Sequence, residues 1–198
     1  KYINGHSDVV GGIVVAKTKA LHQTMQEWAN ILGLSGAPFD SYLTLRGLRT
    51  LQLRMQAHEK NALALAQVLS GHSSVEKVYY PGLTSHPSHA IAKKQQSGFG
   101  GILSFKIKFG LREVEKFFKY LEYFSLAESL GGFESLVCHP YTMTHAALSP
   151  EQKEKAGISE NLIRISVGIE QQEDIIESIL KALELKSVNA NPILKVMK

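Results

Sequence analysis

Residues 39–71, FDSYLTLRGLRTLQLRMQAHEKNALALAQVLSG, hold the longest helical pattern in this 198-residue sequence. Apolar side chains recur through it at three- and four-residue spacing, the repeat of one face of an α-helix. They are Tyr42, Leu45, Leu48, Leu51, Met55, Ala62, Leu65 and Leu69. The pattern predicts one long helix from about Phe39 to Leu69, closed by Gly71 and His72. A helix of this length often joins two domains.

The residues ahead of this helix predict one strand and one further helix. The run VVGGIVVA at 9–16 is short, apolar and rich in β-branched residues, which indicates a buried strand of an α/β sheet. Thr18 is a helix-capping residue type, and Gly33 is typical of a helix end. Between them we expect a helix from Lys19 to Leu32.

The residues after Gly71 alternate between strand and helix patterns. We expect strands at 75–80, 102–107 and 162–167, and two short strands on either side of Gly131 and Gly132. We expect helices at 90–96, 111–121 and 173–185. This alternation predicts a small α/β or α+β layer domain, followed by a surface tail at 187–198.

Composition excludes several classes of protein. Hydrophobic residues make up 44% of the chain and charged residues 20%, as in an ordinary globular protein. The net charge is +4, but acids and bases are intermingled, so we expect no nucleic acid partner. No segment is long and apolar enough to span a membrane, and no signal peptide is recognisable. With the single Cys138 no intramolecular disulfide can form, so we expect a cytoplasmic protein.

Two segments combine reactive side chains with an unusual setting. The stretch AESLGGFES at 127–135 places an acid and a hydroxyl beside a glycine pair, which lets the backbone approach a ligand closely; an ordinary strand–turn–strand is the alternative. Arg164 lies inside the apolar strand pattern LIRISV, where a charge is costly unless it meets an anion. Its guanidinium suits a carboxylate in two-point contact, so we expect either a ligand carboxylate or an internal Glu or Asp.

Other candidate sites are weaker. His86 and His89 flank Pro87 in a loop that has no acidic or thiolate companion, so we expect no metal site. The glycines at 98–101 precede a strand instead of a helix, which argues against a phosphate cradle.

Seven segments resemble, in one common order, the Cys/Met-metabolism family of pyridoxal-phosphate (PLP) enzymes. The first begins at Lys1, the counterpart of the lysine that carries the cofactor. The segments are KYINGHSDVV at 1–10, FDSYL at 39–43, RGLRTL at 46–51, YPGL at 80–83, AESLGGFES at 127–135, MTHA at 143–146 and LIRISVGIE at 162–170. The chain begins at this lysine without a methionine, so we expect it to be the C-terminal part of a longer protein.

The resemblance implies an α/β protein of PLP fold type I, similar to aspartate aminotransferase. Residues 1–36 would end the large PLP-binding domain, and 37–71 would form a connecting helix. The complete small C-terminal α/β domain would then span 72–187, and 188–198 would be a tail. The resemblance also implies a homotetramer with active sites shared between subunits, and a missing N-terminal half that holds most cofactor contacts.

The resemblance assigns roles to six residues. Lys1 would bind pyridoxal 5'-phosphate covalently and move protons. Arg164 would bind the substrate α-carboxylate, helped by Ser129 and Thr144. Glu128 and Asn30 would face the distal part of the substrate, and a glutamate before the serine goes with γ chemistry in the family.

The activity implied is that of a cystathionine gamma-synthase, in which cysteine replaces the γ-substituent of an activated L-homoserine ester. This reaction belongs to transsulfuration and methionine biosynthesis. WAN at 28–30 and CHPYTM at 138–143 are more similar to bacterial synthases than to γ-lyases. Cystathionine gamma-lyase and a non-catalytic fragment are the alternatives.

Overall fold

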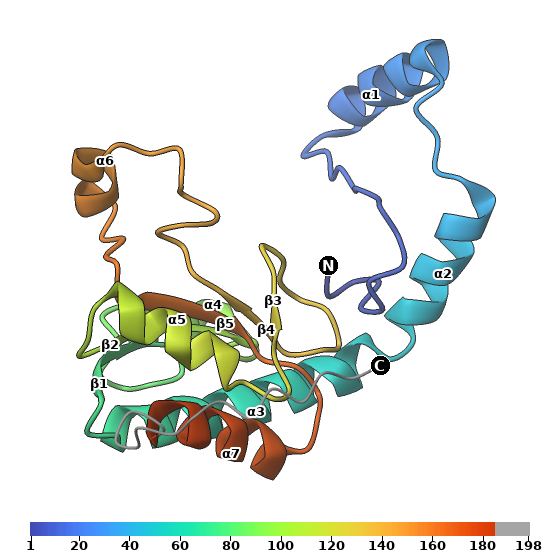
Figure 1. The fold of residues 1–198 in the computed structure, drawn as a ribbon. Helices are drawn as coiled ribbons and strands as arrows, with labels where there is room; N and C mark the ends of the chain where they lie inside the picture. Colours follow the sequence, from blue (N-terminus) through green and yellow to red (C-terminus); the bar gives the residue numbers. More distant parts are fainter. Residues whose placement is uncertain (185–198) are drawn as a thin grey trace, which may run out of the picture.

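A computed structural model describes residues 1–184 of the chain, which form a five-stranded sheet with helices and a projecting arm (Figure 1). The strand order is β1-β2-β5-β4-β3. Adjacent strands are antiparallel, except that β3 pairs with β4 in parallel. The strands are β1 Val75–Tyr79, β2 Ile102–Ile107, β3 Ser125–Leu126, β4 Leu136–Cys138 and β5 Leu162–Ser166.

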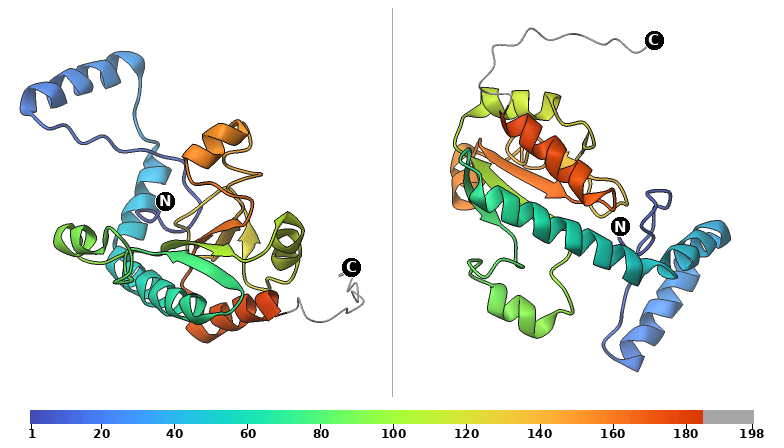
Figure 2. Two further views of the ribbon diagram at one scale, coloured as in Figure 1. Left: turned by 90° about the vertical axis from the view of Figure 1, so that its left-hand side faces the viewer. Right: turned by 90° about the horizontal axis from the view of Figure 1, so that it is seen from below.

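Seven helices accompany the sheet in the described residues. They are α1 Lys19–Leu32, α2 Pro38–Leu48, α3 Leu51–Gly71, α4 His89–Gln95, α5 Leu111–Lys119, α6 Pro150–Lys155 and α7 Gln172–Glu184. Helices α3 and α7 lie side by side against one face of the sheet, with α5 next to α7 (Figures 1 and 2). None of the helices within 1–184 is long and apolar enough to cross a membrane.

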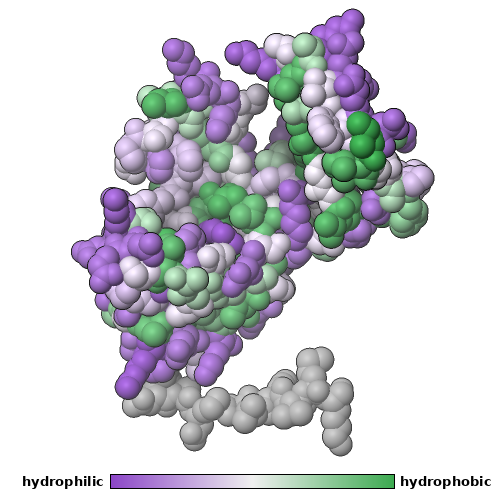
Figure 3. All heavy atoms as spheres, turned by 90° about the horizontal axis from the view of Figure 1, so that it is seen from above, coloured by the Kyte–Doolittle hydropathy of each residue, from purple (hydrophilic) through white to green (hydrophobic). Residues whose placement is uncertain are grey.

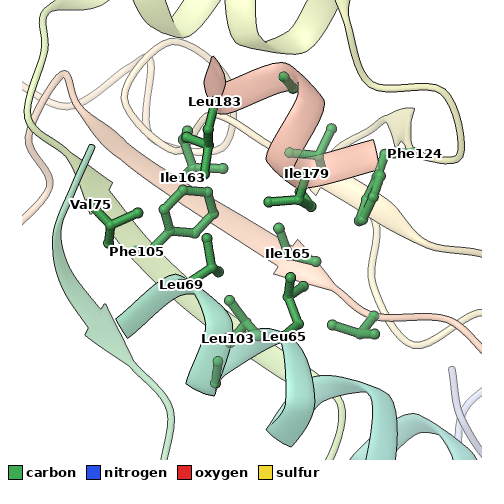
Figure 4. Packing of buried hydrophobic residues seen from close by; sticks show 14 of the residues in the cluster. Leu65, Leu69, Val75, Leu103, Phe105, Phe124, Ile163, Ile165, Ile179 and Leu183 are labelled. Carbon is green, nitrogen blue, oxygen red and sulfur yellow. The ribbon is translucent and has the colours of Figure 1, made fainter. Parts of the chain in front are cut away.

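The core lies between the sheet and helices α3, α5 and α7 (Figure 4). Strand β2 alternates as predicted, with Leu103, Phe105 and Ile107 buried and the residues between them half-buried. Ile163 and Ile165 of β5 point to the same side, because successive side chains of a strand alternate between faces. The helices contribute Leu65, Leu69, Ile175 and Ile179, all of which are fully buried.

Residues 1–50, which we call the N-terminal arm, begin with a turn against this layer and then extend away from it (Figures 1 and 2). Helix α1 has the predicted bounds, because Thr18 Oγ1 accepts the Leu21 N–H and Gly33 ends the helix at a φ of 69°. None of the residues of α1 is buried. Apolar side chains are exposed along the arm, among them Val10, Trp28, Ile31 and Leu34 (Figure 3).

The prediction of a strand at 9–16 is wrong for the described chain. The segment has no strand structure, and Val10 is 99% exposed. No other segment within 1–184 pairs with it. A strand needs a neighbour to satisfy its backbone N–H and C=O groups, so the β-branched run alone does not produce one.

The prediction of one helix from Phe39 to Leu69 is also wrong, because α2 and α3 are separated at Arg49 and Thr50. The carbonyl of Gly47 causes the break. It accepts hydrogen bonds from the Thr50 N–H, the Thr50 hydroxyl and Arg54 Nη2. In a continuous α-helix this carbonyl would accept the N–H of Leu51 instead, so these donors take the place of the bond that would continue the helix.

Two other differences concern the C-terminal half. Two short strands flank Gly131 and Gly132 as predicted, but they are parallel, so the connection is not a hairpin. Helix α6 was not predicted; it begins with a capping box in which Ser149 and Gln152 bond each other's backbone. The predicted tail at 187–198 lies outside the described residues.

Candidate active site

Three of the predicted site residues meet at one place. The Lys1 Nζ donates a hydrogen bond to Ser129 Oγ at 2.9 Å. The Arg164 Nη2 donates to the backbone carbonyl of Ser129 at 3.3 Å. Ser129 therefore joins the first residue of the chain to the central strand β5, across 128 and 35 positions of sequence.

The loop that carries Ser129 is fixed to β5 at a second point. The Gly131 N–H donates to Ser166 Oγ at 2.8 Å, and Ser166 lies on the same face of β5 as Arg164. Gly131 has a φ of 77°, and a Cβ there would lie 3.3 Å from the Lys1 Cβ. A glycine is needed here for both reasons, so the glycine pair does bring the backbone close to Lys1.

Arg164 has no acidic partner within residues 1–184. Its neighbours across the sheet are Ser104 of β2 and Cys138 of β4, and it forms no ion pair there. Of the two alternatives left open by the sequence, the internal Glu or Asp is therefore excluded for the described residues. One long hydrogen bond to a carbonyl leaves most of the guanidinium donors available for an anion.

The other predicted site residues are less closely connected. Glu128 directly precedes Ser129, and its side chain is exposed. Thr144 Oγ1 lies 2.8 Å from His145 Nδ1 in the turns after β4. Asn30 is exposed in the last turn of α1, which stands apart from the Ser129 loop in Figure 1. The roles assigned to these three residues stay predictions.

Sequence reasoning missed a buried polar stripe at the start of α3. Arg54, His58 and Asn61 are buried at spacings of four and three residues, directly before the apolar stripe of Leu65 and Leu69. The signal was present, because these three polar residues occupy the positions that continue the apolar spacing backward. Polar side chains at helical spacing ordinarily face solvent, so apolar periodicity alone does not mark these three residues as buried.

This stripe binds backbone carbonyls around the candidate site. Arg54 reaches the carbonyls of Tyr2 and Ile3. His58 Nδ1 lies 2.7 Å from the Val167 carbonyl, directly after β5, and its ring packs edge-on against Tyr2 at 4.9 Å. Asn61 Nδ2 donates to the carbonyls of Gly168 and Glu170. The stripe therefore links the start of the chain to the end of the strand that carries Arg164.

The comparisons with known proteins agree with this arrangement. Residues 1–184 match the Cys/Met metabolism PLP-dependent enzyme family. The chain belongs to this family. Its PLP fold type I architecture is supported by solved structures of cystathionine gamma synthase from Xanthomonas oryzae pv. oryzae, one in complex with cystathionine and one with aminoacrylate and cysteine. Both have a TM-score of 0.88 and 55% identity, over 92% of this chain and 47% of theirs.

Curated members of the family with different activities are about equally similar to the chain. Cystathionine beta-lyase of Coxiella burnetii is 49% identical over 92% of this chain and 48% of its own. Cystathionine gamma-lyase of Dictyostelium discoideum is 47% identical over 93% and 48%. Cystathionine gamma-synthase of Escherichia coli is 49% identical over 90% and 46%. The chain spans about half the length of these relatives.

The family uses pyridoxal phosphate, and Lys1 fits the aldehyde end of this cofactor. Its side chain is exposed, forms no ion pair within the described residues, and is held by a neutral hydroxyl. A primary amine of this kind can attack an aldehyde carbon once it is neutral.

Proposed function

We propose that this chain is the C-terminal part of a cystathionine gamma-synthase. The observation that supports this reading is the Lys1–Ser129–Arg164 cluster, in a chain 55% identical to a γ-synthase of known structure. Identity to the curated relatives does not separate the activities, because the E. coli γ-synthase and the C. burnetii β-lyase are both 49% identical to this chain. The reaction proposed joins cysteine to the γ-carbon of an activated L-homoserine ester.

Each residue of the cluster has a distinct role in this proposal. Arg164 binds the α-carboxylate of the substrate through the donors that no protein acid occupies. The Lys1 Nζ would remove one proton at the substrate Cα and, after releasing it, one at Cβ, and protons would be returned to both carbons once the Cγ–S bond has formed. Ser129 Oγ would hold the amine between these steps. Pyridoxal phosphate, when bound, supplies the electron sink for the negative charge that develops at these carbons.

The replacement itself exchanges one bond at the γ-carbon for another. The Cγ–O bond to the ester group breaks, and the group leaves as its carboxylate or phosphate. The Cγ–S bond forms with cysteine, whose thiol proton is lost to a base. Glu128, exposed beside Ser129, carries a charge that would attract the amino group of cysteine or cystathionine.

A product assay on the full-length protein tests this proposal. The enzyme is supplied with cysteine and each of three homoserine esters (succinyl, acetyl and phosphoryl) and, separately, with cystathionine alone. We expect cystathionine formation to have the larger kcat/KM, and reactions without cysteine serve as the control. A larger kcat/KM for 2-oxobutyrate release from cystathionine would favour the γ-lyase, and pyruvate release would favour a β-lyase.

We further infer that the N-terminal arm packs against residues the relatives carry ahead of Lys1, and against other subunits of a homotetramer. Contiguous exposed apolar surface is typical of an interface. On the arm such side chains include Val10, Ile13, Val14, Val15, Leu21, Trp28, Ile31, Leu32, Leu34, Phe39, Tyr42 and Leu45. We expect the 198-residue chain of 21.9 kDa to be inactive alone, and full-length protein to have a tetrameric mass by light scattering.

A further inference from the structure

Arg54 lies at the junction between the arm and the rest of the chain. It is 6% exposed, in the first turn of α3. Its Nη1 donates to the Tyr2 carbonyl at 2.8 Å, and its Nη2 donates to the carbonyls of Gly47 at 2.7 Å and Ile3 at 3.4 Å. Its Nε donates to Thr50 Oγ1 at 3.1 Å. One guanidinium thus binds the Tyr2–Ile3 backbone, the Gly47 carbonyl and the Thr50 hydroxyl.

The charge of Arg54 is not matched by an acid. Within residues 1–184 it forms no ion pair, and every acceptor it uses is a carbonyl or a hydroxyl. The Gly47 carbonyl belongs to the last turn of α2, where the aligned peptide dipoles leave partial negative charge. A buried cation without a carboxylate is costly, so its presence here points to a geometric role that a neutral residue would not perform.

Two glycines show how closely the Lys1–Gly5 turn packs against Arg54 and against α2. Gly5 has a φ of 72°, its N–H donates to the Lys1 carbonyl at 2.8 Å, and a Cβ on it would overlap the Arg54 guanidinium. A Cβ on Gly47 would overlap the carbonyl oxygen of Asn4. Gly5 and Gly47 are the only buried residues in the arm. The arm is therefore tightly packed at one place, the turn from Lys1 to Gly5 around Arg54.

We propose that Arg54 is the positioning residue that holds the Lys1–Gly5 turn and thereby places the Lys1 amine beside Ser129. Arg54 fixes the two carbonyls that follow Lys1, and His58 contacts the ring of Tyr2 from the next turn of α3. The Ser129–Gly131 loop contacts the Lys1 side chain from the other direction. The proposal rests on the proposed function in one respect, the use of Lys1 as the reacting amine.

Hydrogen exchange tests the structural part of this proposal without any assay of activity. In the full-length protein, Arg54→Lys keeps the charge but loses the planar fork that reaches several carbonyls at once. Arg54→Gln removes the charge, and Thr50→Ala removes the acceptor of Nε together with the hydroxyl that donates to the Gly47 carbonyl. We expect the Gly5 amide to exchange roughly tenfold faster in both Arg54 variants, and less so in Thr50→Ala, because the turn opens locally. Peptides from β2 and α7 should exchange as in the unaltered protein.

Steady-state kinetics test the functional part. A misplaced amine should lower kcat by roughly 10- to 100-fold, with KM unchanged, because Arg164 still binds the carboxylate. Arg112→Lys is the matched control, since Arg112 is an exposed arginine in the first turn of α5. Unchanged exchange at Gly5, or a raised KM with unchanged kcat, would overturn the proposal. If the unaltered protein makes no cystathionine, the proposed function fails, and the exchange of Gly5 still decides the role of Arg54.

Discussion

The N-terminal arm and the layer formed by residues 51–184 differ in where their apolar side chains lie. In the arm Val10 is 99% exposed and Phe39 is 68% exposed, whereas in the layer Phe105 and Leu65 are completely buried. The layer therefore has a hydrophobic core of its own, while the arm is held chiefly at the Lys1–Gly5 turn. Lys1, which carries the proposed reacting amine, is part of the arm in the sequence, but its amine contacts Ser129 of the layer. The proposed reaction therefore depends on how these two regions are joined.

The largest effect should come from removing the amine at this junction. In the full-length protein, Lys1→Ala should lower kcat by roughly 10⁴-fold or more, by analogy with the loss of other nucleophilic residues. The visible absorbance of the bound cofactor should also vanish, and borohydride should fix no cofactor to the chain. Lys17→Ala, an exposed lysine of the same arm, is the control and should behave as the unaltered protein. Covalent cofactor retained in Lys1→Ala would contradict the assignment.

A matched pair of phenylalanines tests the difference in packing directly. Phe105→Ala should destabilise the 198-residue chain by about 3–5 kcal/mol, because it leaves a cavity in the core. Phe39→Ala should change its free energy of unfolding by less than about 0.5 kcal/mol, as exposed sites do. Urea unfolding measures both. Equal decreases in the free energy of unfolding would contradict the difference between arm and layer. A larger decrease for Phe39→Ala in the full-length protein than in the 198-residue chain would indicate that the arm is covered there.

Arg164 belongs to the layer but should matter for the substrate more than for folding. We expect Arg164→Ala to cost about 2–5 kcal/mol in kcat/KM, by analogy with truncating one partner of a buried charge pair. The melting temperature should change little, because Arg164 has no acidic partner in the described residues. Arg112→Ala provides the exposed control. Unaltered kinetics, or unfolding of Arg164→Ala, would mean that its role is structural.

The smallest effect concerns buried histidines, which in the described chain occur only in the layer. Burial lowers the pKa of His58 and of His139 below the ordinary 6.5, so both are neutral in the folded chain at pH 7. The unfolded chain binds more protons below pH 6.5, so stability should fall as the pH is lowered from 7 to 5. His58→Asn should weaken this pH dependence, because it removes one of the two histidines whose pKa burial lowers. Urea midpoints measured at several pH values decide between these outcomes.

Elements whose causes are local were predictable from sequence. The bounds of α1 followed from the Thr18 cap and Gly33, and β2 followed from its alternation. A glycine pair in a loop and an arginine in an apolar strand drew attention to Ser129 and Arg164 separately, and only the family resemblance put the two residues at one site. The role implied for Lys1 came from family resemblance alone, since no local pattern brings it beside Ser129.

Elements whose causes are distant were not predictable. The break at Arg49 and Thr50 depends on Arg54 binding the Gly47 carbonyl, and this contact depends on the position of residues 2–5. The run at 9–16 has strand composition but no neighbour within 1–184. From sequence alone, the polar residues Arg54, His58 and Asn61 are expected to face solvent. In the structure they are buried because they bind backbone carbonyls from distant parts of the chain.

The strand order has a consequence for synthesis on the ribosome. Strand β5 is the last strand in residues 1–184, yet it lies between β2 and β4 at the centre of the sheet. Residues 108–161 must be translated after β2 before its partner can emerge, which takes roughly 3–11 s at ordinary elongation rates. During this interval β2 exposes an unpaired edge with Leu103, Phe105 and Ile107, which is a template for aggregation. The nascent chain is therefore most vulnerable just before Arg164 is translated, and the proposed carboxylate site is completed in the same step that closes the sheet.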